Sequence, residues 1–131
     1  MAKILIVEDE AIIALSTKKS LEKMGHTKII IVDNGEKAVQ YVRENQPDLI
    51  LMDLKINGAM DGIETVQEIR KFSEVPVIYT TGNSDPKAKE RAANTSKSEF
   101  LSKPIESTQL LAALQKFLFV FPLSFYFNIK L

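Results

Sequence analysis

The stretch Asp48-Leu49-Ile50-Leu51-Met52-Asp53-Leu54 is an apolar run that ends on a carboxylate. Four consecutive apolar residues between polar ones are too few for a helix, so the run predicts a strand that is buried on both faces. Asp53 then stands at the carboxyl end of that strand. In an open parallel sheet, ligands bind at this end, because the loops from strands to helices leave a crevice there. Asp53 is therefore a candidate functional residue, although an isolated aspartate after a strand more often begins a turn.

The composition of the chain limits the kind of protein to expect. Its 131 residues suit one domain with a single core. The 17 Lys and Arg balance the 17 Asp and Glu, and no long basic run is present, so no binding to nucleic acid is indicated. The absence of cysteine excludes disulfides and thiolate metal sites. Because the short apolar run near Met1 ends on acidic residues, it is not a secretory signal, and we expect a cytoplasmic protein that does not insert into a membrane.

Strand-like apolar runs alternate with helix-like patterns along the chain. Strands are predicted at residues 4–7, 28–32, 49–53, 75–80 and 99–102, and helices at about 10–24, 36–44, 63–72, 86–94 and 107–118. Parallel strands need crossover connections, which the predicted helices supply. The pattern therefore predicts an α/β fold in which a five-stranded parallel sheet carries five helices on its two faces.

Two of the predicted helices carry apolar stripes that we expect to cover the sheet. The stripes are Ile12, Ile13, Leu15, Leu21 and Met24 in the first helix, and Ile63, Val66, Ile69 and Phe72 in the third. His26 follows Gly25 in a predicted turn, and we expect it at the surface. The helix at 86–94 has little besides alanine to bury, so we expect it to be the element most free to shift.

Candidate site residues stand at the ends of four of the five predicted strands. They are Glu8 and Asp9 after the first, Asp53 at the end of the third, Thr81 after the fourth and Lys103 after the fifth. The carboxyl ends of parallel strands meet at one edge, so these groups are expected to lie together. Three crowded carboxylates repel one another, and a hard divalent cation, of which Mg2+ is the one favoured here, would hold them. Open positions on that cation suit a phosphoryl group, with Lys103 adding positive charge, Thr81 a hydroxyl donor and Asp53 a nucleophile that can form an acyl phosphate.

This set of residues resembles the receiver domain of two-component response regulators. The landmarks are Glu8-Asp9, Asp53, Met60-Asp61-Gly62, Thr81-Gly82, Phe100 and Lys103-Pro104, and the resemblance extends from about residue 3 to residue 118. It implies a flavodoxin-like doubly wound sheet with strand order 2-1-3-4-5. It also implies a signalling switch, not an enzyme with turnover, which catalyses only its own phosphorylation and slow hydrolysis.

The resemblance implies that Asp53 accepts phosphate from a sensor histidine kinase or a histidine phosphotransfer protein. Mg2+ would be the cofactor. Its ligands would be Asp9 and Asp53 directly, Glu8 through water, and the backbone carbonyl of Lys55.

The resemblance also implies how the phosphorylated state is read. Thr81 and Phe100 would move toward the phosphoryl group, and Lys103 would pair with its oxygens. The Lys103-Pro104 bond is expected to be cis. Because the chain shows no output domain, the signal would leave by protein contact: with a downstream protein effector, as a relay to a histidine phosphotransfer protein, or through a histidine kinase partner.

Two features depart from the common pattern of the family. The loop between Asp53 and Asp61-Gly62 is one residue longer than usual, and Gly82 stands where an alanine is common. Lys55 and Asn83 lie where side chains could approach the phosphoryl group and tune the lifetime of the phosphorylated state.

The last residues lie outside the resemblance. Residues 1–120 are expected to form the receiver domain, and residues 121–131 an apolar tail that alternates from Leu123 with the period of a strand. At this length it cannot span a bilayer as a helix. Three accounts stay open: an edge strand on its own domain, an interface that makes a homodimer through the last helix or the tail, and the end of a longer hybrid chain.

Three rival functions fit the sequence less well than the switch does. A phosphohydrolase of the haloacid dehalogenase type needs an acid two residues after the nucleophile, where this chain has Lys55. A receiver-shaped module that never binds phosphate would not need Asp53, Thr81 and Lys103 together. A flavodoxin would need a phosphate loop rich in Ser, Thr and Gly after the first strand, which is absent.

Overall fold

The computed structural model of the chain describes residues 2–82 and 86–118. Their strands are β1 (Lys3–Val7), β2 (Lys28–Val32), β3 (Leu49–Asp53), β4 (Val77–Thr81) and β5 (Ser98–Ser102). Their helices are α1 (Ala11–Lys23), α2 (Gly35–Asn45), α3 (Gly62–Ile69), α4 (Pro86–Ala93) and α5 (Ser107–Phe117). The expected apolar tail, residues 121–131, lies outside the described residues.

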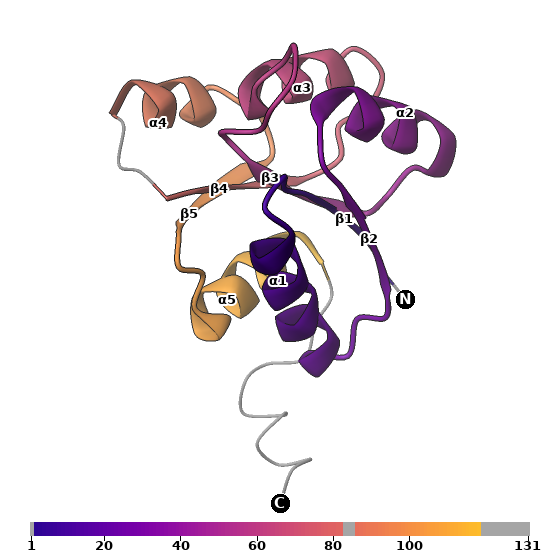
Figure 1. The fold of residues 1–131 in the computed structure, drawn as a ribbon, viewed down its shortest axis with the longest axis vertical. Coiled ribbons are helices and arrows are strands. Elements are labelled where there is room, and N and C mark those ends of the chain that lie inside the picture. The colour runs from indigo at the N-terminus through magenta and orange to yellow at the C-terminus, as the bar shows by residue number, and fades with distance from the viewer. Residues whose placement is uncertain (1, 83–85, 119–131) are drawn as a thin grey trace, which may run out of the picture.

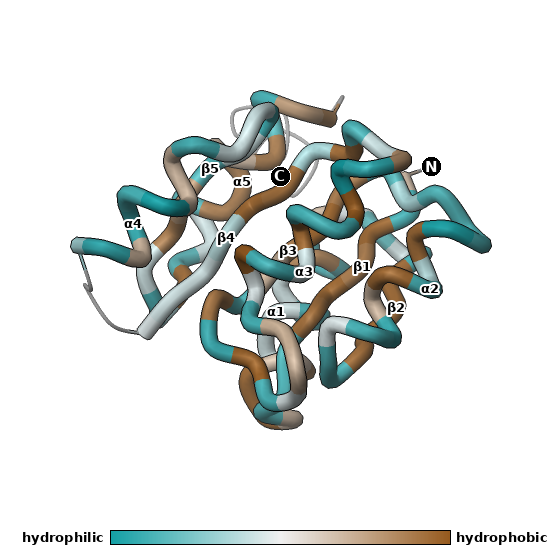
Figure 2. Tube along the Cα trace, turned by 90° about the horizontal axis from the view of Figure 1, so that it is seen from above, coloured by the Kyte–Doolittle hydropathy of each residue, from teal (hydrophilic) through white to brown (hydrophobic). Residues whose placement is uncertain are grey.

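The five strands form one parallel sheet in the order β2-β1-β3-β4-β5, which confirms the predicted fold class and strand order. Helices α1 and α5 cover one face of the sheet, and α2, α3 and α4 cover the other (Figure 1). Hydrophobic residues line the inner strands, whereas the outward sides of the helices are hydrophilic (Figure 2). All five residues of β3 are buried, as its unbroken apolar run predicts for a strand covered on both faces.

The predicted apolar stripe of α1 was wrong in part. Ile12 is 84% exposed and Leu15 is 54% exposed, whereas Ala14, Thr17 and Leu21 are the buried residues of this helix. Positions 14, 17 and 21 recur at intervals of three and four residues, so they lie on one helical face. The helix thus turns Ala14, Thr17 and Leu21 inward and leaves the large apolar side chains of Ile12 and Leu15 facing outward.

The predicted stripe of the third helix was also too long. Helix α3 ends at Ile69, and Phe72 follows in a turn that begins at Arg70. The ring of Phe72 is partly exposed and lies 4.2 Å from the guanidinium of Arg43. Ile63, Val66 and Ile69 alone form the buried stripe, because the turn takes Phe72 off the helix axis.

The predicted surface position of His26 was wrong as well. His26 is only 6% exposed. Its backbone N–H donates to the carbonyl of Leu21, and the positive φ of Gly25 turns the chain at the end of α1. Its Nε2 is buried and has no hydrogen-bond partner among the described residues. Burial lowers the pKa of His26 below its ordinary 6.5.

Acid is therefore expected to destabilise the protein through His26. Below about pH 6.5 the unfolded chain takes up a proton on His26 that the folded chain resists, so the free energy of unfolding falls as the pH falls. Glutamine does not titrate, so we expect the free energy of unfolding of His26→Gln to lack this dependence on pH. The difference in free energy of unfolding between wild type and the variant is therefore expected to narrow as the pH falls from about 7.5 to 5.5. Urea denaturation at several pH values in the presence of Mg2+ measures the difference. A gap that stays constant over this range would contradict the expectation.

Candidate functional site

Asp53 is the last residue of β3 and is 5% exposed. Both of its carboxylate oxygens accept hydrogen bonds: Oδ1 from the backbone N–H of Lys55 at 3.1 Å, and Oδ2 from Nζ of Lys103 at 3.0 Å. The acid is thus buried at the carboxyl edge of the sheet with its donors already in place. Such a carboxylate is held in one orientation and stays available as a nucleophile or a ligand.

Lys103 approaches the site from the end of β5. Its backbone N–H donates to the carbonyl of Thr81 at 2.7 Å, which fixes the start of the following loop. Its Nζ then donates to Oε1 of Glu8 at 2.7 Å as well as to Asp53, so one ammonium bridges the ends of β1 and β3. The peptide bond between Lys103 and Pro104 is cis.

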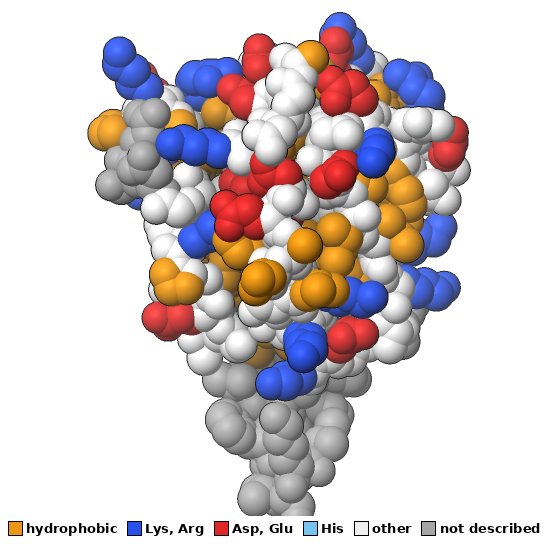
Figure 3. Space-filling view, in the orientation of Figure 1, with side chains coloured by type: hydrophobic (Ala, Val, Ile, Leu, Met, Phe, Trp, Pro, Cys, Tyr) orange, Lys and Arg blue, Asp and Glu red, His pale blue; other side chains and the backbone are white. Residues whose placement is uncertain are grey.

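Three carboxylates gather at this edge, from Glu8, Asp9 and Asp53. One oxygen of each lies within 4.8 Å of the others. Glu8 and Asp53 are buried, whereas Asp9 is partly exposed and accepts the backbone N–H of Asn57 at 3.2 Å. Acidic side chains can be seen together in the middle of the face drawn in Figure 3.

The electrostatics of the cluster leave it short of positive charge. Burial, together with the neighbouring Asp53 carboxylate, raises the pKa of Glu8 to about 7 against the opposing effect of Lys103. Burial alone would lower the pKa of Lys103, but its hydrogen bonds to Glu8 and Asp53 outweigh this and raise it. The ammonium of Lys103 thus pairs with two of the three carboxylates, and Glu8 holds a proton more readily than a free glutamate does.

These residues fit a small divalent cation. All three side chains offer oxygen ligands, and a cation beside them would stabilise the charged form of Glu8 against its burial and against the neighbouring Asp53 carboxylate. Glu8, Asp9 and Asp53, with the backbone carbonyl of Lys55, are the groups that would hold it. The donor set lacks nitrogen and sulfur, which favours Mg2+ over zinc or copper.

The other predicted site residues lie at different distances from this cluster. Thr81 is buried at the end of β4, one residue beyond the Thr80 that pairs with Asp53 across the sheet. Phe100 lies in the middle of β5, opposite Tyr79, and packs partly buried against the core under α4. The side chain of Lys55 is exposed beside the groove described below. Asn83 lies outside the described residues.

Two contacts that shape the site were not anticipated from the sequence. One is the hydrogen bond from the backbone of Asn57 to Asp9, made by the loop that follows β3. The other is the packing of Gly62 on Asp53: a Cβ at Gly62 would lie 2.3 Å from the carbonyl oxygen of Asp53. The Asp61-Gly62 pair in the sequence was a signal for the packing of Gly62 on Asp53. The contact between Asn57 and Asp9 had no such signal, because it involves only the backbone N–H of Asn57.

A groove of about 730 Å³ opens beside Asp53, between α1 and the loop that follows β5. Ile12 and Ile13 of α1 line one side, and Pro104 and Ile105 line the other. Hydrophobic side chains lie directly below the acidic ones in Figure 3, over the position that α1 occupies in Figure 1. The exposed apolar residues of α1 therefore adjoin the acidic cluster.

A comparison with protein families identifies the arrangement. The response regulator receiver domain matches residues 4–115. The chain belongs to this family. Receiver domains are parts of two-component signalling proteins, and the acidic cluster at the carboxyl edge of the sheet is where the family binds Mg2+.

Curated relatives of this receiver domain are longer proteins. It is 32% identical over 114 residues to the transcriptional regulatory protein YvrH of Bacillus subtilis, and 30% identical over 113 residues to the transcriptional regulatory protein PdtaR of Mycobacterium tuberculosis. The alignments cover 87% and 86% of this chain but 48% and 55% of those proteins. The chain thus spans about half the length of the curated relatives it matches.

Solved receiver domains share the fold. The receiver domain of a Pseudomonas aeruginosa sensor histidine kinase, solved with a magnesium ion coordinated in its active site cleft, superposes with a TM-score of 0.79 at 28% identity, covering 88% of this chain and 96% of that one. Vibrio cholerae chemotaxis protein CheY4 superposes with a TM-score of 0.78 at 27% identity, covering 90% of this chain and 99% of that one.

Among residues 2–82 and 86–118 of this receiver domain, no helix has the length and apolar character to cross a membrane.

Proposed function

We propose that this receiver domain is a phosphorylation-controlled switch in which Asp53 accepts the phosphoryl group of a phosphohistidine. The observation that carries the proposal is the shared ammonium of Lys103, which bridges Asp53 and Glu8 beside the partly exposed Asp9. Phosphoryl transfer depends mainly on positioning and on neutralising the charge of the phosphoryl oxygens. A buried nucleophile, a lysine and three acids able to hold a divalent cation are the groups that this requires.

The transfer exchanges one bond for another. A carboxylate oxygen of Asp53 attacks the phosphorus, the P–O bond forms as the P–N bond to the donor histidine breaks, and the imidazole leaves with the electron pair and takes a proton from solvent. Lys103 would move its hydrogen bonds to the phosphoryl oxygens. Slow attack by water on the phosphorus later breaks the same P–O bond and returns the Asp53 carboxylate and inorganic phosphate.

Mg2+ is the cofactor that we propose for the acidic cluster. Asp9, Asp53 and the carbonyl of Lys55 would bind it directly, and Glu8 through water. When bound, it supplies positive charge against the phosphoryl oxygens. Lys55 and Asn83 would tune the lifetime of the phosphorylated state through their side chains.

The output of the switch is proposed to be a change of protein contacts. Thr81 and Phe100 would move toward the phosphoryl group and alter the face that α4 shares with β5 and α5. A downstream protein effector would read that face, and residues 1–120 would act as the receiver unit, in the cytoplasm. In this proposal the protein turns over no substrate besides its own phosphoryl group. A homodimer through α5 or the tail is one form that the output can take.

Intact-mass spectrometry after incubation with Mg2+ and acetyl phosphate tests the proposal. We expect one phosphate-sized gain in mass, which EDTA prevents and which hydroxylamine removes, because an acyl phosphate is cleaved by that reagent. A gain that survives hydroxylamine would place the phosphate on a residue other than an aspartate. No gain under any of these conditions would favour the module that never uses phosphate.

The groove beside Asp53 is proposed as the docking site of the protein that carries the phosphohistidine. The donor imidazole must come within bonding distance of Asp53, and the groove opens on that residue between α1 and the loop after β5. The neighbouring α1 face exposes Ile12 and Leu15, large apolar residues that would be buried by such a partner.

We expect the double variant Ile12→Ser with Leu15→Ser to receive phosphate at least about tenfold more slowly from a phosphorylated histidine phosphotransfer protein, as loss of apolar contact residues predicts. Labelling by acetyl phosphate, which needs no docking surface, is expected to stay at the wild-type rate. Ile30→Ser is the control, because Ile30 is 44% exposed and lies on the edge strand β2 and not on α1. Equal slowing with both donors would refute the docking surface.

A further inference from the structure

Helix α4 is attached to the domain by few apolar contacts. Of its residues Pro86–Ala93, only Ala92 is buried, and Ala88 is partly buried against the core. The area that two alanine methyl groups remove from water contributes little free energy. Polar and charged contacts therefore have an unusually large share in deciding where this helix lies.

Lys89 joins α4 to the side chain of Phe100 on β5. Its Nζ lies 5.3 Å from the centroid of the Phe100 ring, within the distance at which an ammonium is attracted to the face of an aromatic ring. Phe100 packs partly buried under the helix. The ammonium thus covers the ring on its outer side, and the position of one side chain depends on that of the other.

Arg91 joins the same helix to the loop that follows Asp53. Its guanidinium lies 3.4 Å from Oδ2 of Asp61, and the two side chains are 50% and 36% exposed. The other oxygen of Asp61 caps α3 by accepting the backbone N–H of Glu64 at 2.8 Å. Asp61 also immediately precedes Gly62, whose Cα packs on Asp53. Arg91 is thus connected to the loop between Asp53 and Gly62 through one exposed ion pair.

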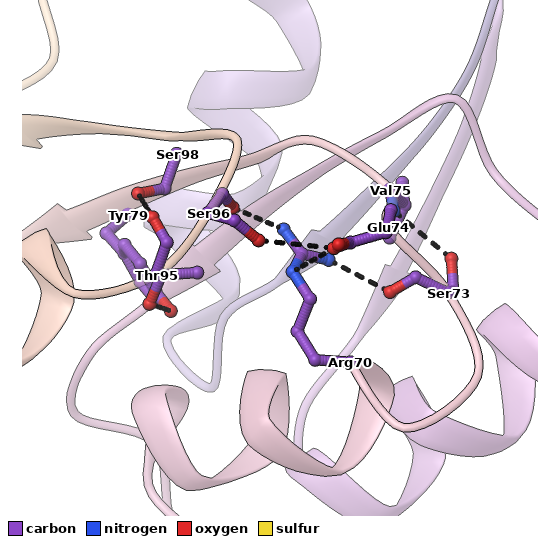
Figure 4. Close-up of polar contacts among 8 residues, drawn as sticks. All are labelled: Arg70, Ser73, Glu74, Val75, Tyr79, Thr95, Ser96 and Ser98. Carbon is purple, nitrogen blue, oxygen red and sulfur yellow. Dashed lines mark hydrogen bonds and ion pairs between the residues drawn. The ribbon is translucent and has the colours of Figure 1, made fainter.

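The loop after α4 is held independently of these two contacts (Figure 4). Arg70 donates to the carbonyls of Ser73 at 3.2 Å and Ser96 at 2.8 Å. The hydroxyl of the fully buried Tyr79 is hydrogen-bonded to Oγ1 of Thr95 at 2.8 Å. The chain just beyond α4 is therefore fixed, and a displacement of the helix would pivot about its carboxyl end.

We propose that Lys89 and Arg91 are positioning residues that together latch α4 in the unphosphorylated state, one to Phe100 and the other to the loop after Asp53. Each contact is exposed and weak, which allows a modest free energy at the site to release it. The existence of the latch stands on the contacts alone, whereas its release by phosphorylation rests on the proposed function. If phosphorylation draws Phe100 away from Lys89, the free energy by which phosphorylation weakens the latch equals the free energy by which the latch opposes phosphorylation.

Hydrogen exchange read by mass spectrometry on the full unphosphorylated chain tests the latch. In the double variant Lys89→Gln with Arg91→Gln, we expect the amides of residues 86–93 to exchange roughly fivefold faster, and those of β3 and β4 to be unchanged. Glu90→Gln is the control, since Glu90 is exposed on the same helix and glutamine has nearly the helix propensity of the residues it replaces. Raising NaCl to about 0.5 M is expected to speed exchange of α4 in wild type and in the control but not in the double variant.

A second experiment distinguishes the loss of the contact between Lys89 and the ring of Phe100 from a general loss of positive charge on α4. In a Phe100→Leu background, Lys89→Gln is expected to add no further increase in exchange, because the ring that it attracts is gone. Equal exchange of residues 86–93 in wild type and the double variant would overturn the proposal. It would also be overturned if Lys89→Gln increased exchange as much in the Phe100→Leu background as it does in wild type. Faster labelling of the double variant by acetyl phosphate would support release by phosphorylation. Absence of labelling in every variant would count against the proposed function and leave the exchange result to decide the latch.

Discussion

The variant Asp53→Asn is expected to gain no phosphate from acetyl phosphate at any concentration of Mg2+, whereas wild type gains one. An amide oxygen is a far poorer nucleophile than a carboxylate and has no negative charge to bind a cation, so both of the roles proposed for Asp53 fail together. The fold is expected to survive, because asparagine has the same shape and its oxygen can still accept the hydrogen bond from Lys55 or Lys103. Intact mass measured beside a circular dichroism spectrum separates loss of chemistry from loss of structure.

Asp33→Asn is the matched control for this experiment. Asp33 follows β2, so it lies after a strand of the same sheet, but its side chain is exposed, pairs with Lys37 at 3.2 Å and accepts a hydrogen bond from the side-chain amide of Asn34 at 3.1 Å. This variant is expected to label as wild type does. If Asp53→Asn still gained a phosphate that hydroxylamine removes, another carboxylate would be the acceptor and Asp9 would be the next to test.

The variant Gly62→Ala is expected to lose stability and phosphorylation together. The added methyl would lie 2.3 Å from the carbonyl oxygen of Asp53 and 2.9 Å from Cα of Leu54, and both of these are backbone atoms of the buried strand and its continuation. Because neither can turn away as a flexible side chain would, β3 or α3 has to shift. Overpacking of this kind costs about 1–3 kcal/mol or more, and here the displaced atoms carry the acceptor. Urea denaturation measures the loss of stability, and intact mass the loss of labelling.

Gly82→Ala tests whether the effect at Gly62 comes from the close packing and not from replacement of a glycine near the site. Among residues 2–82 and 86–118, a Cβ at Gly82 would meet only Cδ of Lys103, at 3.9 Å, which is an ordinary contact. We expect Gly82→Ala to be neutral or to stabilise by about 0.4–1 kcal/mol through reduced freedom of the unfolded chain. Equal loss of stability in the two variants would show that the short distances to Asp53 and Leu54 are not the cause.

Much of the fold followed from local patterns in the sequence. The buried run of β3 with Asp53 at its end, and the acidic pair after β1, could be read without any contact information, because the period of the apolar residues is a local property. The parallel sheet followed from the alternation of strands and helices. Local patterns were less reliable for the faces of helices, as Ile12 and Leu15 illustrate: residue type alone does not say that the sheet accepts Ala14 and Thr17 at close range.

The sequence by itself determined the class of fold and which chemical groups stand at the ends of the strands. Only the tertiary structure decided which of those groups touch, because each decisive contact joins residues that are far apart in the chain. Lys103 reaches Glu8 across 95 positions and Asp53 across 50, and the backbone of Asn57 reaches Asp9 across 48. The burial of His26 and the two attachments of α4 are likewise products of packing. No local pattern encodes them, since each depends on the position of a second element.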